Sequence, residues 1–170
     1  RLRRVINKGI TEEDLLATCK SAFELGWKLI KFYFMFGLPT ETWEDLEAIP
    51  KLARKALQVI PGGGRRITIS TGTFVPKPHT AFQWEPQLSV EEGFERIDFL
   101  KDHLASKQLQ VRWSDPRQSF LEGVMSRGDR SLSQLIITAW RQGARLDGWS
   151  EHFRLDTWKQ AASDIAIPMG

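Results

Sequence analysis

The chain has very little cysteine: Cys19 is the single one among 170 residues. One cysteine excludes an intrachain disulfide framework and any all-cysteine metal site built within this chain. It suits a reducing compartment, so we expect a cytoplasmic protein. Cys19 falls on the apolar face of an expected helix, which favours a small core residue over a nucleophile.

Long apolar runs are also missing. The longest, Phe32 to Phe36, is far shorter than the roughly 20 residues that cross a bilayer. The Arg-rich start lacks the apolar region of a signal peptide, so we expect no membrane partner. The chain begins at Arg1 rather than Met and enters a charged segment at once, from which we expect a fragment of something larger or a processed chain.

Signatures of catalysis and metal binding are scarce. No pair among His79, His103 and His152 has the spacing of a helical metal site, and no Gly-x-Ser-x-Gly is present. The glycines at 62–64 lack the following Lys-Ser/Thr of a phosphate-binding loop, so a plain connection is predicted. No metal ligand is predicted, and the catalytic residues stay unassigned.

The charge balance is only mildly basic, with a formal net charge of +3. That value is compatible with nucleic-acid contact but is weak support for it. Basic residues are dispersed apart from 1–4 and 65–66, which favours a solvated surface.

Strands and helices alternate along the chain, which predicts an α/β fold with a parallel sheet. The apolar run in the first strand predicts burial on both faces, and Pro50 should kink or split the second helix. The expected elements are helix 11–25, strand 29–36, helix 43–59, strand 67–75, helix 90–106, strand 109–113, and helices from 115, from 131 and over 156–163.

Polar residues follow the strand ends, where parallel α/β barrels keep their chemistry. Glu41 and Glu85 could share one rim and act as an acid/base pair or hold a ligand hydroxyl. Glu41 could equally complement a helix dipole. His79 could shuttle a proton or be a structural loop residue.

The turn Gly37-Leu38-Pro39-Thr40-Glu41-Thr42 resembles the turn after the fifth strand of radical S-adenosylmethionine (radical SAM) enzymes. The likeness is to tRNA methylthiotransferases and oxygen-independent coproporphyrinogen oxidases, which have Gly-Phe/Leu-Pro-Gly-Glu/Gln-Thr there. Residues 4–11 resemble the segment after strand four, 74–85 resemble strand six and its loop, and 115–130 resemble a C-terminal tail. The most similar branch is an uncharacterised bacterial one that often carries a cobalamin-binding-like domain upstream.

This resemblance implies a partial TIM-type (β/α) barrel with parallel strands and a C-terminal helical extension. Residues 1–113 would be the C-terminal half of the barrel and 114–170 the extension. In such enzymes a Cys-x3-Cys-x2-Cys motif holds a 4Fe-4S cluster that cleaves S-adenosylmethionine, and this chain lacks that motif. The implied parent is an iron–sulfur oxidoreductase or transferase that uses S-adenosylmethionine and a 4Fe-4S cluster, with cobalamin as the further cofactor its branch suggests.

By itself the fragment is then expected to be inactive and to bind no cofactor tightly. Its implied partner is the missing N-terminal half of the barrel, and the substrate, a small molecule or RNA, is not identified. An open sheet edge would also allow self-association. The alternative is a non-catalytic RNA-binding or assembly module.

The resemblance also implies site residues, carried over position by position. Lys8 stands where related enzymes often have an Arg that reaches the carboxylate of the cofactor, and Thr40 replaces the second Gly of the family turn. The S-adenosylmethionine pocket would be lined by the two strand ends, and two further residues would lie toward the substrate. These are Phe36 and Gly37, then Thr73, Phe74 and Val75, and on the substrate side His79 and Glu85.

Overall fold

The computed structural model describes residues 1–169, and the chain divides into two compact units. Unit 1 comprises residues 1–73 and 91–114. Unit 2 comprises residues 74–90 and the chain from Asp115 onward. By sequence, segment 74–90 is assigned to the barrel half, residues 1–113. In the structure this segment contacts the helical extension and forms one compact unit with it.

Unit 1 is an α/β unit built around three strands. Its elements are α1 (Leu2–Val5), α2 (Glu12–Glu24), β1 (Leu29–Phe36), α3 (Trp43–Gln58), β2 (Arg66–Thr73), α4 (Val90–Leu104) and β3 (Leu109–Trp113). The expected strand at 67–75 ends earlier than predicted, because the chain leaves the sheet after Thr73. The other expected elements of this unit are confirmed, with bounds that shift by two residues or fewer.

Helices α2 and α3 begin with reciprocal side-chain caps. The Thr11 hydroxyl accepts the Asp14 N–H at 3.1 Å, and the Asp14 carboxylate accepts the Thr11 N–H at 3.0 Å. Thr42 and Asp45 form the same pair at the start of α3. Each pair satisfies two backbone donors that have no partner within the helix, so both helices start where the sequence predicts.

Proline 50 does not split α3, which excludes one of the two predicted effects. The helix runs unbroken from Trp43 to Gln58 with Pro50 inside it. The Pro50 ring is fully buried. Burial of the ring on the packed face offsets part of the cost of the lost helical hydrogen bond.

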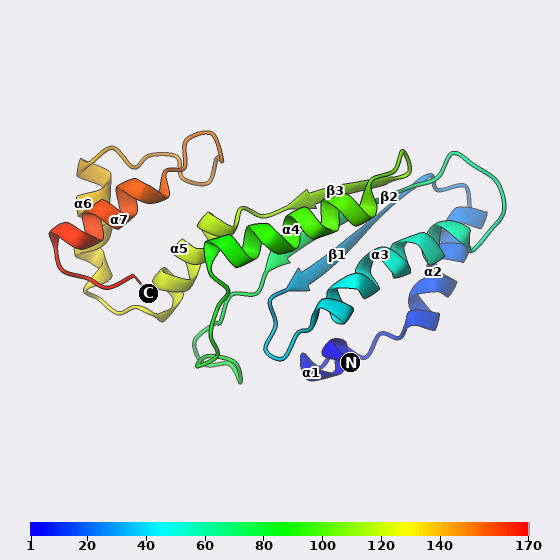
Figure 1. Ribbon diagram of the computed structural model, residues 1–170, viewed down its shortest axis with the longest axis horizontal. Coiled ribbons are helices and arrows are strands. Elements are labelled where there is room, and N and C mark those ends of the chain that lie inside the picture. The colour runs from blue at the N-terminus through cyan, green and yellow to red at the C-terminus, as the bar shows by residue number, and fades with distance from the viewer. Residues whose placement is uncertain (170) are drawn as a thin grey trace. The chain divides into compact units, whose positions relative to one another are not determined.

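The sheet of unit 1 is parallel and has the sequential order β1-β2-β3. Phe32 pairs with Ile69, and Ile69 with Val111, so the three strands are in direct register. Helices α3 and α4 run across the same face of this sheet (Figure 1). Sequential strand order with crossover helices on one face is the arrangement of a (β/α) barrel, whereas a doubly wound sheet has helices on both faces.

The expectation that β1 is buried on both faces is wrong. Its side chains alternate: Phe32 and Phe36 are buried, whereas Tyr33 is 74% exposed and Met35 is 48% exposed. Helices α3 and α4 cover only one face of the sheet, and on the other face the side chains of β1 are exposed while Thr68 of β2 is 7% exposed. The core of unit 1 lies under these helices and includes Cys19, Phe23, Phe32, Phe36, Leu46, Leu52, Ile67, Ile69, Ile97 and Leu100.

Unit 2 is a helical unit. It contains α5 (Pro116–Arg127), α6 (Leu132–Arg141) and α7 (Leu155–Asp164), preceded by the irregular segment 74–90. Asp115 caps α5, and its carboxylate accepts the Arg117 N–H at 2.9 Å. Leu121, Leu132, Leu135, Ala139, Phe153, Trp158 and Ala161 form its separate apolar core.

The chain is therefore an α/β protein with a partial (β/α)-barrel arrangement in unit 1 and a helical extension in unit 2. None of the helices among residues 1–169 is long and apolar enough to pass through a bilayer.

Candidate functional site at the sheet of unit 1

The turn that leaves β1 has an unusual backbone. Gly37 has φ of 79° and Thr40 has φ of 66°, both in the left-handed region. Glycine reaches this region without strain, but a β-branched residue such as Thr does so at a cost. Thr40 is held there by Arg1, which donates to the Thr40 carbonyl at 2.7 Å and to its hydroxyl at 3.1 Å.

Glu41 faces inward from this turn and is nearly buried. Its side chain is 7% exposed, and its carboxylate accepts the Gly37 N–H at 2.9 Å. Arg96 of α4 lies beside it, with 3.6 Å between Nε and the carboxylate. Burial raises the pKa of Glu41, while the Gly37 hydrogen bond and the Arg96 charge act against that rise.

Arg96 connects the turn to two aromatic residues, Trp43 and Phe99. Its guanidinium lies 5.3 Å from the centre of the Trp43 ring, and Trp43 contacts Phe99 of α4 at a centroid distance of 5.4 Å. Glu41 therefore ties the end of β1 to α4. Glu41 precedes the helix cap Thr42, so it lies outside the first turn of α3, whose acidic residues are Glu44 and Asp45.

Three residues predicted to line a cofactor pocket lie at the carboxyl ends of β1 and β2. Phe36 and Thr73 are register partners on the helix-covered face, where Phe36 is fully buried and Thr73 is 9% exposed. The Thr73 hydroxyl has no hydrogen-bond partner among the described residues. The Gly37 N–H is already bonded to Glu41.

The other predicted site residues divide between the units. Lys8 is exposed in unit 1, whereas Phe74, Val75, His79 and Glu85 belong to unit 2. The Phe74 ring is buried and meets Phe82 edge-to-face at 6.0 Å. His79 has φ of 60° and donates its N–H to Gln83 at 3.3 Å, and the Glu85 N–H bonds the Phe82 carbonyl at 3.1 Å. His79 and Glu85 thus belong to one tight turn.

The sheet face that α3 and α4 leave uncovered is called here the open face. Because side chains alternate along strands and partners in a parallel pair point the same way, the register defines it. It carries Leu29, Lys31, Tyr33 and Met35 from β1, Arg66, Thr68, Ser70 and Gly72 from β2, and Gln110 and Arg112 from β3.

The open face has small residues at its centre and longer ones on either side. The central strand β2 contributes small hydroxyl residues, Thr68 and Ser70, while the strands on either side contribute longer ones. Residues at the same register position lie side by side across the three strands. One such set is Lys31, Thr68 and Gln110, and the next is Tyr33, Ser70 and Arg112. On this face β2 therefore presents small groups, Thr68, Ser70 and Gly72. Such a face can hold a polar ligand.

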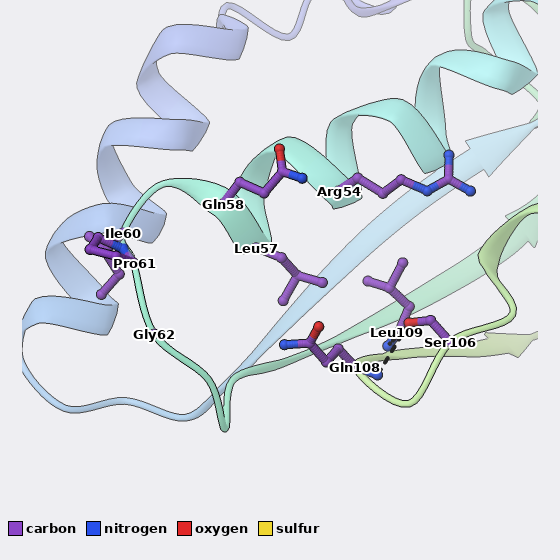
Figure 2. Close-up of a pocket in the computed structure, with 9 residues that line it drawn as sticks. All are labelled: Arg54, Leu57, Gln58, Ile60, Pro61, Gly62, Ser106, Gln108 and Leu109. Carbon is purple, nitrogen blue, oxygen red and sulfur yellow. Dashed lines mark hydrogen bonds between the residues drawn. The ribbon is translucent and has the colours of Figure 1, made fainter.

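A separate hollow of about 440 Å³ lies at the opposite end of unit 1 (Figure 2). It lies where α3 ends and β3 begins, with Leu57 and Leu109 in its wall. The hydroxyl of Ser106, which also lines it, accepts the N–H groups of Gln108 and Leu109 at 3.2 and 3.1 Å. Barrel enzymes use the carboxyl ends of their strands for chemistry, so this hollow at the amino ends is better explained by loop structure.

Cys19 and the acidic residues form no other site. Cys19 is 2% exposed, and burial raises the pKa of its thiol, which confirms the interpretation as a core residue. Among residues 1–169, no group of three or more His, Cys, Asp and Glu side chains could hold a metal ion.

Comparison with known proteins gives one informative relative. The chain is 33% identical over 137 residues to the uncharacterized protein MJ0966 of Methanocaldococcus jannaschii, a match that covers 80% of this chain. The same match covers only 29% of that protein, so the chain spans less than a third of its length. No family model matches the chain. No solved structure matches it either.

Sequence reasoning missed the residues of the open face on β1 and β3. Lys31 and Tyr33 were treated as part of an apolar strand, and Arg112 as part of a short strand, without attention to the face on which they lie. The available signal was the alternation of Lys31, Tyr33 and Met35 with the phenylalanines at 32, 34 and 36. It also missed Arg96, because its partner Glu41 lies 55 positions away in the sequence.

Proposed function

We propose that this chain is part of a radical SAM enzyme, in which it forms the C-terminal half of the (β/α) barrel. The observation that carries the proposal is the sheet itself. Its strands are parallel and in sequential order, helices cover one face, and the other face is polar and open. In a closed barrel the face without helices points to the interior, and the chemistry takes place at the carboxyl ends of the strands.

The resemblance of the turn after β1 to the family supplies the second support. The turn lies at the carboxyl end of a barrel-type strand, as the resemblance requires. Thr40 adopts a left-handed conformation at the position where the family has a second Gly. The Gly37–Glu41 hydrogen bond makes this turn a fixed rim rather than a loose loop.

In this proposal the opposite wall of the cavity comes from the N-terminal half of the barrel, which would carry the 4Fe-4S cluster. The cluster would supply the electron that cleaves S-adenosylmethionine. The residues of this chain would supply one wall of the cavity, with the rim at Gly37 and the hydroxyls of Thr68 and Ser70 facing inward. The enzyme would work in the cytoplasm, which agrees with a buried, unpaired Cys19.

The test uses a longer protein that contains a region like this one. Full-length MJ0966 is produced without oxygen, supplied with iron and sulfide, and mixed with dithionite and S-adenosylmethionine. We expect the iron–sulfur cluster to absorb visible light and to give an electron paramagnetic resonance signal when it is reduced. We also expect release of 5′-deoxyadenosine. A protein that binds no iron–sulfur cluster under these conditions would overturn the proposal.

The whole protein that contains this chain, prepared in the same way, offers a matched pair of variants. Gly37→Val fills the rim, and Lys20→Ala is an exposed control. The first change should abolish or strongly reduce 5′-deoxyadenosine release while iron content stays the same. The second should leave both unchanged. Equal activity of the two variants would show that this rim is not part of the cavity.

A further inference from the structure

The net positive charge of the chain is confined to one unit. Unit 1 holds 16 basic and 13 acidic residues, whereas unit 2 holds eight of each. The formal charge of +3 therefore belongs to the unit that carries the sheet. The acidic residues of unit 1 lie on its helices and connections, and none occupies a position on the open face.

The open face holds three cations that have no acidic partner. Lys31, Arg66 and Arg112 are exposed, and within residues 1–169 no carboxylate lies at ion-pair distance from any of them. The Lys31 ammonium lies 4.5 Å from the centre of the Tyr33 ring. Unpaired cations that converge on one surface attract an anion.

The placement of these cations suits a compact anion. Lys31 and Arg112 stand on the two strands that flank β2, each roughly 5 Å from it. Between them lie Thr68, which is 7% exposed, and Ser70, which is partly exposed, and each carries a hydroxyl that can donate a hydrogen bond. Arg presents a planar fork that matches the oxygens of a phosphate, and Lys adds a point charge.

We propose that the open face binds a small organic phosphate, with the phosphate seated over Thr68 and Ser70 between Lys31 and Arg112. Binding of a single-stranded nucleic acid is less favoured, because such surfaces stack successive bases on several aromatic rings. Tyr33 is the one aromatic side chain on the open face. One ring can support one heterocycle.

This inference deepens the proposed function, since it names the substrate class of the cavity that the barrel would enclose. The phosphate site itself belongs to this chain and needs neither cluster nor S-adenosylmethionine. The two ideas can therefore fail separately. Phosphate binding without a cluster in the longer relative would leave the site standing and remove the radical chemistry.

The probe is uridine 5′-diphosphate, with uridine as the uncharged control, titrated into the full 170-residue chain and followed by amide NMR shifts. We expect the diphosphate to shift amides of β2 and its neighbours, and uridine to bind at least about tenfold more weakly. Arg112→Ala and Lys31→Ala should each weaken diphosphate binding by roughly fivefold to tenfold. Lys20→Ala, which removes the same charge from α2, should leave the dissociation constant unchanged.

Three outcomes would overturn the inference. The first is no shift at 10 mM diphosphate, and the second is an equal effect of Lys20→Ala and Arg112→Ala. The third is a twelve-nucleotide oligouridylate that binds roughly a hundredfold tighter than the diphosphate, which would assign the face to nucleic acid. Each variant is checked first for an unchanged pattern of helix amides, so loss of fold is recognised separately.

Discussion

At the scale of single residues, Thr40 shows how one side chain can conflict with its turn. A non-glycine residue in the left-handed region costs about 1–2 kcal/mol, and Thr40 has φ of 66°. The sequence resemblance places a Gly at this position, but only the backbone of the folded chain shows why Gly would fit. The exposed bonds from Arg1 compensate in part.

We predict that Thr40→Gly stabilises the chain by about 0.5–1 kcal/mol, since relief of backbone strain exceeds the added entropy of the unfolded chain. Chemical denaturation measures the free energy of unfolding. Thr40→Ala is the matched control, because it removes the same hydroxyl but keeps the strained backbone. A Gly variant no more stable than the Ala variant would contradict the explanation.

Glu41 is the second residue whose role the folded structure decides. Replacing it by Ala leaves the Gly37 N–H without its acceptor and removes the ion-pair partner of Arg96, which keeps its hydrogen bond to the Glu92 carbonyl. We expect Glu41→Ala to lower the free energy of unfolding by about 2–3 kcal/mol. Glu41→Gln keeps an acceptor for Gly37 and should cost about 1 kcal/mol.

The raised pKa of Glu41 gives this pair a pH dependence as well. Because the folded state binds the Glu41 proton more tightly than the unfolded state, this group makes stability fall as pH rises from the unfolded pKa, about 4.3, through the folded pKa. Thermal melting of the wild type and of Glu41→Gln between pH 4 and 7 measures the difference. The Gln variant should lack this component, and identical profiles would show that Glu41 titrates normally.

At the scale of elements, the starts of helices are set by single capping residues. Asp115 is the cap of α5, with Pro116 at the first helical position. Burial raises the pKa of Asp115, but hydrogen bonds from Arg117 outweigh that effect and leave the pKa lowered. The stabilising contribution of Asp115 is therefore present above its unfolded pKa of about 3.9 and disappears as pH falls through the folded pKa.

We expect Asp115→Ala to destabilise unit 2 by about 1 kcal/mol at pH 7, through loss of the cap. Asp115→Asn should retain much of the cap but lose the acid sensitivity below pH 4. Helix content followed by circular dichroism during urea unfolding, at pH 7 and pH 3.5, measures both effects. A wild type that loses no more stability on acidification than the Asn variant would argue against the role of the charge.

Elements were also where sequence reasoning performed best. The reciprocal caps Thr11–Asp14 and Thr42–Asp45 and the run 109–113 could be read locally, since each depends on residues within a few positions. The sequence could not decide whether Pro50 splits α3, because tolerance of the ring depends on the buried face against which α3 packs. The double-sided burial of β1 was misjudged for a related reason: a run of apolar residues does not show how many layers cover a strand.

At the scale of the whole molecule, the sheet of unit 1 has unpaired edges among the described residues, at β1 and β3. The Gln108 carbonyl accepts the Ile67 N–H, so alternate residues of β3 point their backbone toward β2. The Val111 N–H therefore points away from β2 and is available to another strand. Such edges favour association of chains.

We predict that the 19.5 kDa monomer associates into dimers or larger species as the protein concentration rises. Sedimentation velocity at several concentrations measures this. Val111→Pro removes the outward donor without removing a bond to β2, and should shift the chain toward monomer if β3 is the associating edge. Val111→Thr keeps the donor and is the control. A wild type that remains monomeric at every concentration would contradict the prediction.

The sequence by itself determined the α/β class, most element positions, the core assignment of Cys19 and the family resemblance of the turn after β1. These follow from periodicity, caps and turn residues, which act over a few positions. Only the tertiary structure decided that one sheet face stays open, that Glu41 pairs with Arg96, and that Lys31, Thr68, Ser70 and Arg112 share a surface. Those relations join residues from separate strands and helices, and strand register and helix packing fix them.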